Sequence, residues 1–142
     1  MSQDLNIGSI VRTANAFNVG AVHILGRRRW NKRGAMVTNR YLDVRHHPEP
    51  AELLAWAAGA GYEAVAIDNG PTSEPLETSV LPPRCLLVFG SEGAGISAGL
   101  LADCSRTLRI GQYGSTRSIN VAAAAAIAMH AWVLQHGGSA PD

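Results

Sequence analysis

Apolar and polar residues follow one another along this chain with two different periods, and each period predicts one kind of element. In residues 7–17, IGSIVRTANAF, the apolar positions recur at helical spacing, and Gly20 ends the segment. Asn6 stands where it can cap the N-terminus of that helix. Further helices are predicted over residues 48–60, 97–103 and 119–135, the last of them over a run of alanines.

Short apolar runs between these segments predict strands. The runs are AVHIL (21–25), YEAVAID (62–68), CLLVF (85–89) and RTLRI (106–110). CLLVF is apolar throughout, which is typical of a strand buried on both faces of a parallel sheet. YLDVRHH is irregular or a short strand, and NGPTSEP is a turn. Alternating strands and helices predict an α/β domain with a mostly parallel sheet and helices on both faces, over residues 1–136, with a flexible tail at 137–142.

Composition narrows the class of protein. The chain has 142 residues, 46% hydrophobic and 16% charged, enough to bury a core without disulfides. No apolar run is long enough to cross a bilayer, and MSQDLN is not a secretory signal. We interpret Cys85 and Cys104 as buried, unpaired thiols. These features predict a cytoplasmic protein that does not associate with membranes.

Charge is distributed unevenly along the chain. Residues 1–45 hold eight Lys or Arg against two acids, whereas residues 46–105 hold one against eight. The basic excess is concentrated in GRRRWNKRG, where five cations surround Trp30: Arg27, Arg28, Arg29, Lys32 and Arg33. Cations interleaved with an aromatic ring suit phosphate contacts and base stacking, so we expect this segment to bind RNA. A solvated loop that is merely basic remains the alternative interpretation.

Two strands in the last third of the chain run into glycine loops, CLLVFGSEGAGIS and RTLRIGQYGSTRSIN. Glycine at position 90 would let the backbone approach a ligand closely. Ile67 and Ile110 end their strands at the same sheet edge, where open α/β sheets bind ligands. The loop GSEGAG lacks the Lys-Ser/Thr ending of a Walker loop. A phosphate-binding glycine loop of a generic nucleotide binder, at residues 111–117, stays open as an alternative.

The adjacent histidines His46 and His47 suggest a metal only superficially. No third or fourth ligand stands at a suitable spacing. We therefore expect a solvent-exposed pair and no metal site.

Three blocks of the sequence together resemble the motifs of the SpoU-type (TrmH-like) RNA ribose 2′-O-methyltransferases of the SPOUT class. They are N-x-G-x-x-x-R (Asn6, Gly8, Arg12), F-G-x-E-x-x-G (Phe89, Gly90, Glu92, Gly95) and a third block ending in S-x-N (Ser118, Asn120). Their order and spacing match over nearly the whole chain. The RSIN form of the third block is most similar to the small, single-domain members that modify the tRNA anticodon loop.

The resemblance implies a fold with a C-terminal deep trefoil knot, S-adenosylmethionine bound in the knot loops, and a homodimer. The implied cofactor contacts are Ile67, Gly90, Ile110 and Ser118. Arg12 matches the catalytic arginine, which would fix the adjoining phosphate and help to take the 2′-hydroxyl proton. The residues that would orient Arg12 and the ribose are Asn6, Glu92, Ser118 and Asn120. Plainer roles remain open as well: a surface arginine for Arg12, a helix-dipole carboxylate for Glu92, and helix caps for the two asparagines.

The chain departs from the family pattern in two places. A β-strand normally precedes the first motif, whereas only MSQDL stands before Asn6, so the sheet has lost a strand or, as we hypothesise, the start was assigned late. The segment GQYG at 111–114 replaces the usual proline and methionine, but the spacing from Ile110 to Ser118 is intact and we expect cofactor binding to survive.

The function implied is S-adenosylmethionine-dependent 2′-O-methylation of an RNA ribose, with tRNA favoured over rRNA as the substrate. The alternatives are an rRNA methyltransferase, a catalytically silent RNA-binding protein of the same fold, and a binder of small nucleotides. Apolar helix faces, including the last helix around Met129 and Trp132, are candidates for the dimer surface, although core packing explains these two residues equally well.

Overall fold

The computed structural model describes residues 3–25, 43–90, 95–115 and 119–137. In the first helix, side chains are described from residue 7 onward. The chain divides into two compact units, Met1–Trp56 and Ala57–Asp142. Each unit is described here by itself.

The first unit contains a helix and a small parallel sheet. Its elements are α1 (Gln3–Ala16), β1 (Ala21–Leu25), β2 (Asp43–His47) and the first turns of α2 (Pro50–Ala60). β1 and β2 pair in parallel, with Ala21 opposite Asp43. Val11 and Ala14 form the buried face of α1. The helix begins at Gln3, earlier than predicted, because residues 3–6 include no glycine or proline that would stop it.

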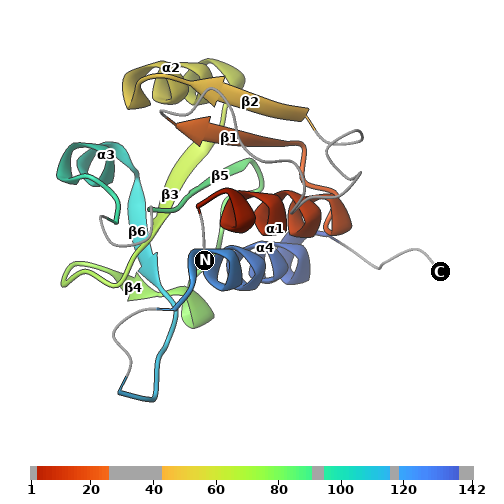
Figure 1. The fold of residues 1–142 in the computed structure, drawn as a ribbon. Helices are drawn as coiled ribbons and strands as arrows, with labels where there is room; N and C mark the ends of the chain where they lie inside the picture. Colours follow the sequence, from red (N-terminus) through yellow and green to blue (C-terminus); the bar gives the residue numbers. More distant parts are fainter. Residues whose placement is uncertain (1–2, 26–42, 91–94, 116–118, 138–142) are drawn as a thin grey trace. The chain divides into compact units, whose positions relative to one another are not determined.

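The second unit contains a four-stranded sheet and the helices α3 and α4 (Figure 1). Its elements are β3 (Glu63–Ile67), β4 (Glu74–Pro75), the 3₁₀ turn η3 (Leu76–Thr78), β5 (Cys85–Val88), α3 (Ala98–Asp103), β6 (Arg106–Arg109) and α4 (Val121–His136). The strand order is β4-β6-β3-β5, and every neighbouring pair is parallel. The expectation of parallel strands alternating with helices is therefore confirmed. β4 lies at the end of the segment predicted as a turn, and η3 follows it where no element was predicted.

The core of the second unit is centred on β3. Val65 of this strand and Leu108 of β6 are completely buried, and Ala128 of α4 packs into the same cluster. The prediction that CLLVF is buried on both faces is wrong. β5 lies at the edge of this sheet and three of its four residues are only half-buried, because among the described strands it pairs with β3 alone.

One mostly parallel sheet was expected, but the described strands form two, one in each unit. The trefoil knot stays a prediction, as do the single domain at 1–136 and the tail, most of which lies outside the described residues. A search of the described residues for a helix able to cross a membrane finds none.

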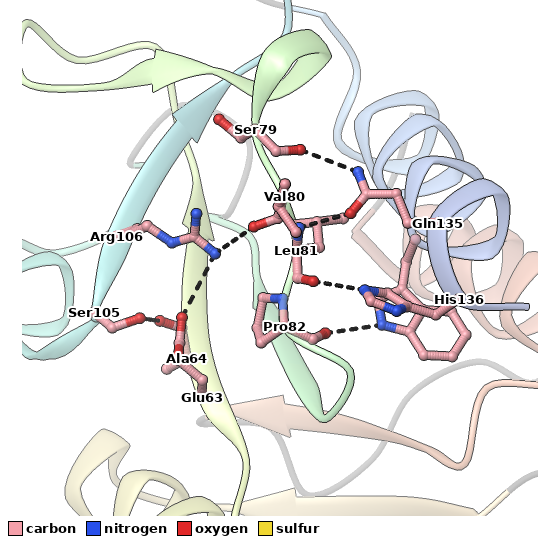
Figure 2. A network of polar contacts seen from close by, with 11 residues as sticks. Glu63, Ala64, Ser79, Val80, Leu81, Pro82, Ser105, Arg106, Gln135 and His136 are labelled. Atoms are coloured by element: carbon pink, nitrogen blue, oxygen red, sulfur yellow. Dashed lines mark hydrogen bonds and ion pairs between the residues drawn. The ribbon is translucent and has the colours of Figure 1, made fainter.

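The last turns of α4 are bound to the segment at residues 79–82 (Figure 2). The Gln135 amide makes two contacts there: its Oε1 accepts from the Leu81 N–H at 2.7 Å, and its Nε2 donates to the Ser79 carbonyl at 3.1 Å. His136 Nε2 lies 2.6 Å from the Leu81 carbonyl oxygen. Residues 79–82 belong to no strand, so side chains of α4 satisfy their backbone groups in place of a neighbouring strand. These hydrogen bonds hold α4 against this segment.

Trp132 continues the same contact, because its indole Nε1 donates to the Pro82 carbonyl at 3.1 Å. Met129 is 7% exposed. Core packing therefore accounts for these two residues. The exposed apolar side chains of α4 are instead Ile127 and Leu134.

Candidate functional site

The carboxyl ends of three parallel strands lie at the same edge of the four-stranded sheet. Ile67, the last residue of β3, lies opposite Leu108 of β6, two residues before Ile110. Gly90 follows β5, whose final residues pair with β3. The structure thus brings together three of the four predicted cofactor positions, and the fourth, Ser118, lies outside the described residues.

Of the two isoleucines, only Ile110 leaves apolar surface at this edge. Ile67 is 8% exposed and belongs to the core cluster, while Ile110 is half-buried and packs against that cluster. Cofactor sites combine apolar walls for a ring system with a few polar backbone groups. The edge has both, since glycine loops follow β5 and β6.

Gly90 is required by the chain's own backbone. A Cβ at this position would lie 2.3 Å from the carbonyl carbon of Gly95 and 2.5 Å from the nitrogen of Ile96. Gly95 itself has φ +70°, a conformation that favours glycine. From the sequence alone, this glycine is explained by the approach of a ligand. The structure shows that the backbone of Gly95 and Ile96 already excludes a side chain. Glu92 lies in that loop, at 91–94, outside the described residues.

The loop after β6 is held by an acid that sequence reasoning missed. The Gly111 N–H donates to both carboxylate oxygens of Glu77, at 3.1 and 3.2 Å. Arg109 donates to the Ser73 carbonyl, and Ser73 Oγ donates to the Gly70 carbonyl at 2.6 Å. These contacts join the segment after β3 to the segment after β6. No sequence pattern signals them, because the partner of Glu77 is a backbone group 34 residues further on.

An open cleft of about 510 Å³ lies between these two segments. We call it the Tyr113 cleft. Its lining includes Asn69, Pro75 and Glu77 on one segment and Arg109, Ile110, Gln112 and Tyr113 on the other. Tyr113 is 99% exposed. Because Ile110 lines the cleft and also lies at the predicted cofactor edge, the cleft adjoins that edge.

Arg12 and Asn6 both lie in α1. Arg12 is exposed beside the buried Val11, and it takes part in an interaction, so it is not an isolated surface charge. Asn6 lies within the helix rather than before it, so the expectation that it caps the N-terminus is wrong. The basic residues at 27–33 lie outside the described residues.

Asn120 is the N-cap of α4. Its Oδ1 accepts from the backbone N–H groups of Ala122 and Ala123, at 2.8 and 3.2 Å. These bonds satisfy two of the donors that a helix leaves unpaired at its start. The capping alternative is thus confirmed, and any contact of Asn120 with the ribose falls to its amide nitrogen.

The prediction of an exposed histidine pair is wrong. His47 is 7% exposed, and its Nε2 lies 2.8 Å from Nδ1 of His23 on β1. Its Nδ1 lies 3.3 Å from a carboxylate oxygen of Glu52 on α2. Pairing of β2 with β1 and the immediate start of α2 enclose this side chain. Among the described residues, no group of three or more His, Cys, Asp or Glu is arranged to hold a metal ion.

Both cysteines are free thiols, as predicted, but half-buried rather than fully buried. Desolvation raises the pKa of Cys85 to about 12, and the nearby charge of Glu63 adds to the effect. Burial also raises the pKa of Cys104. Since only thiolates are good nucleophiles, neither thiol is prepared for covalent catalysis at neutral pH.

The chain is similar to known RNA methyltransferases. The family model of the SpoU rRNA Methylase family matches residues 1–130. The tRNA (guanosine(18)-2′-O)-methyltransferase of Borreliella burgdorferi is 24% identical over 99% of this chain, and the 23S rRNA (guanosine(2553)-2′-O)-methyltransferase of Bacillus subtilis is 32% identical over 88% of it. The chain spans 66% and 52% of the lengths of these two relatives.

Solved structures share the same fold. The SpoU methyltransferase AviRb of Streptomyces viridochromogenes, in complex with AdoMet, gives a TM-score of 0.87 over 97% of this chain and 56% of its own, at 24% identity. A structure concerning the 2-OH methylation of C/U34 on tRNA gives 0.83 over 96% of this chain and 91% of its own, at 26% identity. The α/β fold of the SPOUT class is confirmed. With a family model that covers 130 of its 142 residues, the chain belongs to the SpoU rRNA methylase family.

Proposed function

We propose that this protein transfers a methyl group from S-adenosylmethionine to the 2′-hydroxyl of a ribose in RNA, and that the RNA is tRNA. The observation that carries the proposal is the carboxyl edge of the four-stranded sheet. There Ile67, Gly90 and Ile110 stand at the ends of three strands, within two residues of one another in register. The tRNA relatives support this choice of substrate, and so does a tRNA-methylation structure of nearly the same length as this chain.

The residues at this edge fit the cofactor. The apolar surface that the half-buried Ile110 leaves suits an adenine ring, and the loop of Gly90 brings backbone groups close without a side chain. Ser118 would add a contact from the segment before α4. When bound, the cofactor supplies an electrophilic methyl group on its sulfonium.

The protein must then hold and activate a weak nucleophile. A ribose hydroxyl reacts only when it is in line with the methyl group and its proton can leave. Arg12 would bind the adjoining phosphate and, through its permanent charge, make loss of the 2′-hydroxyl proton to solvent water easier. Orientation of Arg12 and the ribose falls to Asn6, Glu92, Ser118 and Asn120.

RNA binding and assembly complete the proposal. The five cations at 27–33 would contact phosphates, with Trp30 available for stacking. The protein would act in the cytoplasm as a homodimer. Ile127 and Leu134 of α4, 43% and 74% exposed and two helical turns apart, offer an apolar face for a second copy.

The test is transfer of a labelled methyl group from S-adenosylmethionine to total RNA, followed by separation of tRNA from rRNA. Label in tRNA and at the 2′ position supports the proposal. Label confined to rRNA would contradict the choice of substrate, and RNA binding without label would indicate a silent binder.

Arg12→Ala tests the mechanism. We expect it to abolish transfer while cofactor affinity, measured by calorimetry, stays within about three-fold, because Arg12 acts on the RNA. Arg84→Ala is the matched control: it removes the same charge from an exposed arginine that contacts the Ala60 carbonyl and the Tyr62 ring. Equal activity of the two variants would exclude a catalytic role for Arg12.

A further inference from the structure

Tyr113 is the most exposed of the large apolar side chains in the described part of the chain. Its exposed fraction is 99%, against 74% for Val80 and Leu134. It stands on a short loop between Gly111 and Gly114, so neighbouring side chains do not cover its ring. A single exposed aromatic residue is ordinary on a protein surface. Tyr113 differs because it lies beside polar groups that line the same cleft.

The loop that carries Tyr113 is anchored at its base. Glu77 holds the Gly111 N–H with both carboxylate oxygens. A Cβ at Gly111 would lie 3.0 Å from Glu77 Oε1 and 3.5 Å from the Tyr113 hydroxyl oxygen. The tyrosine hydroxyl thus lies near the anchor, and the ring is part of the lining of the Tyr113 cleft. An exposed ring on an anchored loop loses little conformational freedom when a flat ligand stacks on it.

The other groups of the cleft suit the edge of a nucleobase. The Gln112 amide can both donate and accept hydrogen bonds. Glu77 keeps acceptor capacity beyond the Gly111 contact, since a carboxylate offers about four lone-pair sites. Carboxylates accept hydrogen bonds from the amino groups of bases and repel phosphates. The cleft also holds the Arg109 guanidinium, whose Nη1 donates to the Ser73 carbonyl, so one acid and one cation line it. The features that favour a base over a segment of sugar-phosphate backbone are therefore the Tyr113 ring and the Gln112 amide.

The cleft is next to the proposed cofactor site but is not the same surface. Of the three cofactor positions that the structure describes, Ile110 lines the cleft, whereas Ile67 and Gly90 do not. A group bound there would lie beside the cofactor. An RNA that accepts the methyl group must also come close to the cofactor.

We infer that the Tyr113 cleft binds a nucleobase of the RNA substrate, with the Tyr113 ring stacked on the base and the side chains of Gln112 and Glu77 at its edge. This inference rests on the proposed function, because it takes RNA as the substrate. It adds a recognition site that lies outside the basic segment at 26–34 and outside the three sequence motifs.

The experiment compares wild type, Tyr113→Ala and Tyr113→Phe. Binding of total tRNA is measured by fluorescence anisotropy over a range of salt concentrations, and S-adenosylmethionine affinity is measured by calorimetry. Stacking of a base on an aromatic ring contributes enough that Tyr113→Ala should bind tRNA about ten-fold more weakly. Tyr113→Phe keeps the ring and should stay within about two-fold of wild type. The salt dependence should not change, since tyrosine releases no counterions.

Three results would overturn the inference. Wild-type tRNA affinity in Tyr113→Ala would remove the stacking role while leaving the proposed function intact. A loss of cofactor affinity with tRNA affinity unchanged would assign Tyr113 to the cofactor. A wild-type protein that binds no RNA at all would overturn the proposed function together with this inference. Because Tyr113 is fully exposed, none of these results is confused with unfolding, which circular dichroism checks.

Discussion

Gly90 and Gly111 occupy equivalent places in the fold, and the structure gives them opposite roles. Each follows a strand at the carboxyl edge of the four-stranded sheet. A Cβ at Gly90 would meet backbone atoms of Gly95 and Ile96 at 2.3–2.6 Å. A Cβ at Gly111 would meet only the Glu77 and Tyr113 side chains, at 3.0 Å or more. The first loop is closed by its own backbone, and the second is open and held by one carboxylate.

This difference separates a glycine that backbone atoms require from one that faces only side chains. The loop after Gly90 matches the family motif, as a close backbone contact demands. The loop after β6 is where the sequence departs from the usual proline and methionine. A glycine in place of proline adds an N–H group, and Glu77 accepts it. Glu77 therefore satisfies the N–H group that the change to glycine introduces, and it lies outside the three motifs.

Gly90→Ala should break the closed loop and have the largest effect. Flexible side chains can move away from a new methyl group, but backbone atoms at 2.3 Å cannot without displacing the loop. We expect the free energy of unfolding to fall by about 2 kcal/mol or more and cofactor affinity to fall at least about ten-fold. Urea unfolding and calorimetry measure the two quantities.

Gly59→Ala is the matched control for that change. Gly59 lies in α2, where a Cβ would have no atom within 4 Å, and alanine is the better helix former. Its stability should equal or exceed that of wild type. If Gly90→Ala is as stable as this control and binds the cofactor normally, the steric account of the loop is wrong.

Glu77→Ala should loosen the open loop with a smaller effect. The bond is exposed, so we expect a cost of about 1 kcal/mol, seen as an approximately five-fold loss of cofactor affinity. Gly111→Pro removes the N–H group that Glu77 accepts. In that background Glu77→Ala should change cofactor affinity little, so the two substitutions should be coupled. Additive effects in this double-mutant cycle would show that Glu77 acts through another contact.

Cys85 offers the smallest and most selective test, on the strand that leads to Gly90. Its pKa is raised to about 12 in the folded state, whereas an unfolded cysteine ionises near pH 9. Between these values the unfolded chain has lost the proton that the folded chain keeps, so the stabilising contribution is complete below the lower value and is lost as the pH rises. Cys85→Ala should therefore lose less stability than wild type as the pH rises above about 9 toward 12. Parallel losses in both proteins, measured by urea unfolding, would contradict the burial of this thiol.

Much of the fold followed from local pattern. The strands at AVHIL, YEAVAID, CLLVF and RTLRI and the helices between them were predicted because apolar periodicity reports which side of an element is buried. The predicted strand ends placed Ile67 and Ile110 at one sheet edge, the resemblance added Gly90, and the parallel register brings the three positions together.

What could not be predicted depends on contacts between distant segments. The burial of His47 results from its pairing with His23 and the position of Glu52, and adjacent histidines in a sequence carry no sign of it. The place of β5 at a sheet edge is a property of strand order, which an apolar run does not encode. The Glu77 anchor was missed because its partner is a backbone N–H group, and every residue except proline has one.

The parallel arrangement of the strands also has a consequence for how the chain folds. Among the described ladders, paired residues are at least 22 positions apart in the sequence, as for Ala21 with Asp43 and Glu63 with Cys85. No pair of these strands can form as a hairpin, so each must wait until an intervening segment has closed a long loop. The bonds between α4 and residues 79–82 close a loop of more than 50 residues and add to that delay. Folding of this protein is therefore slow for its size, and its apolar strands stay exposed to other chains while they wait.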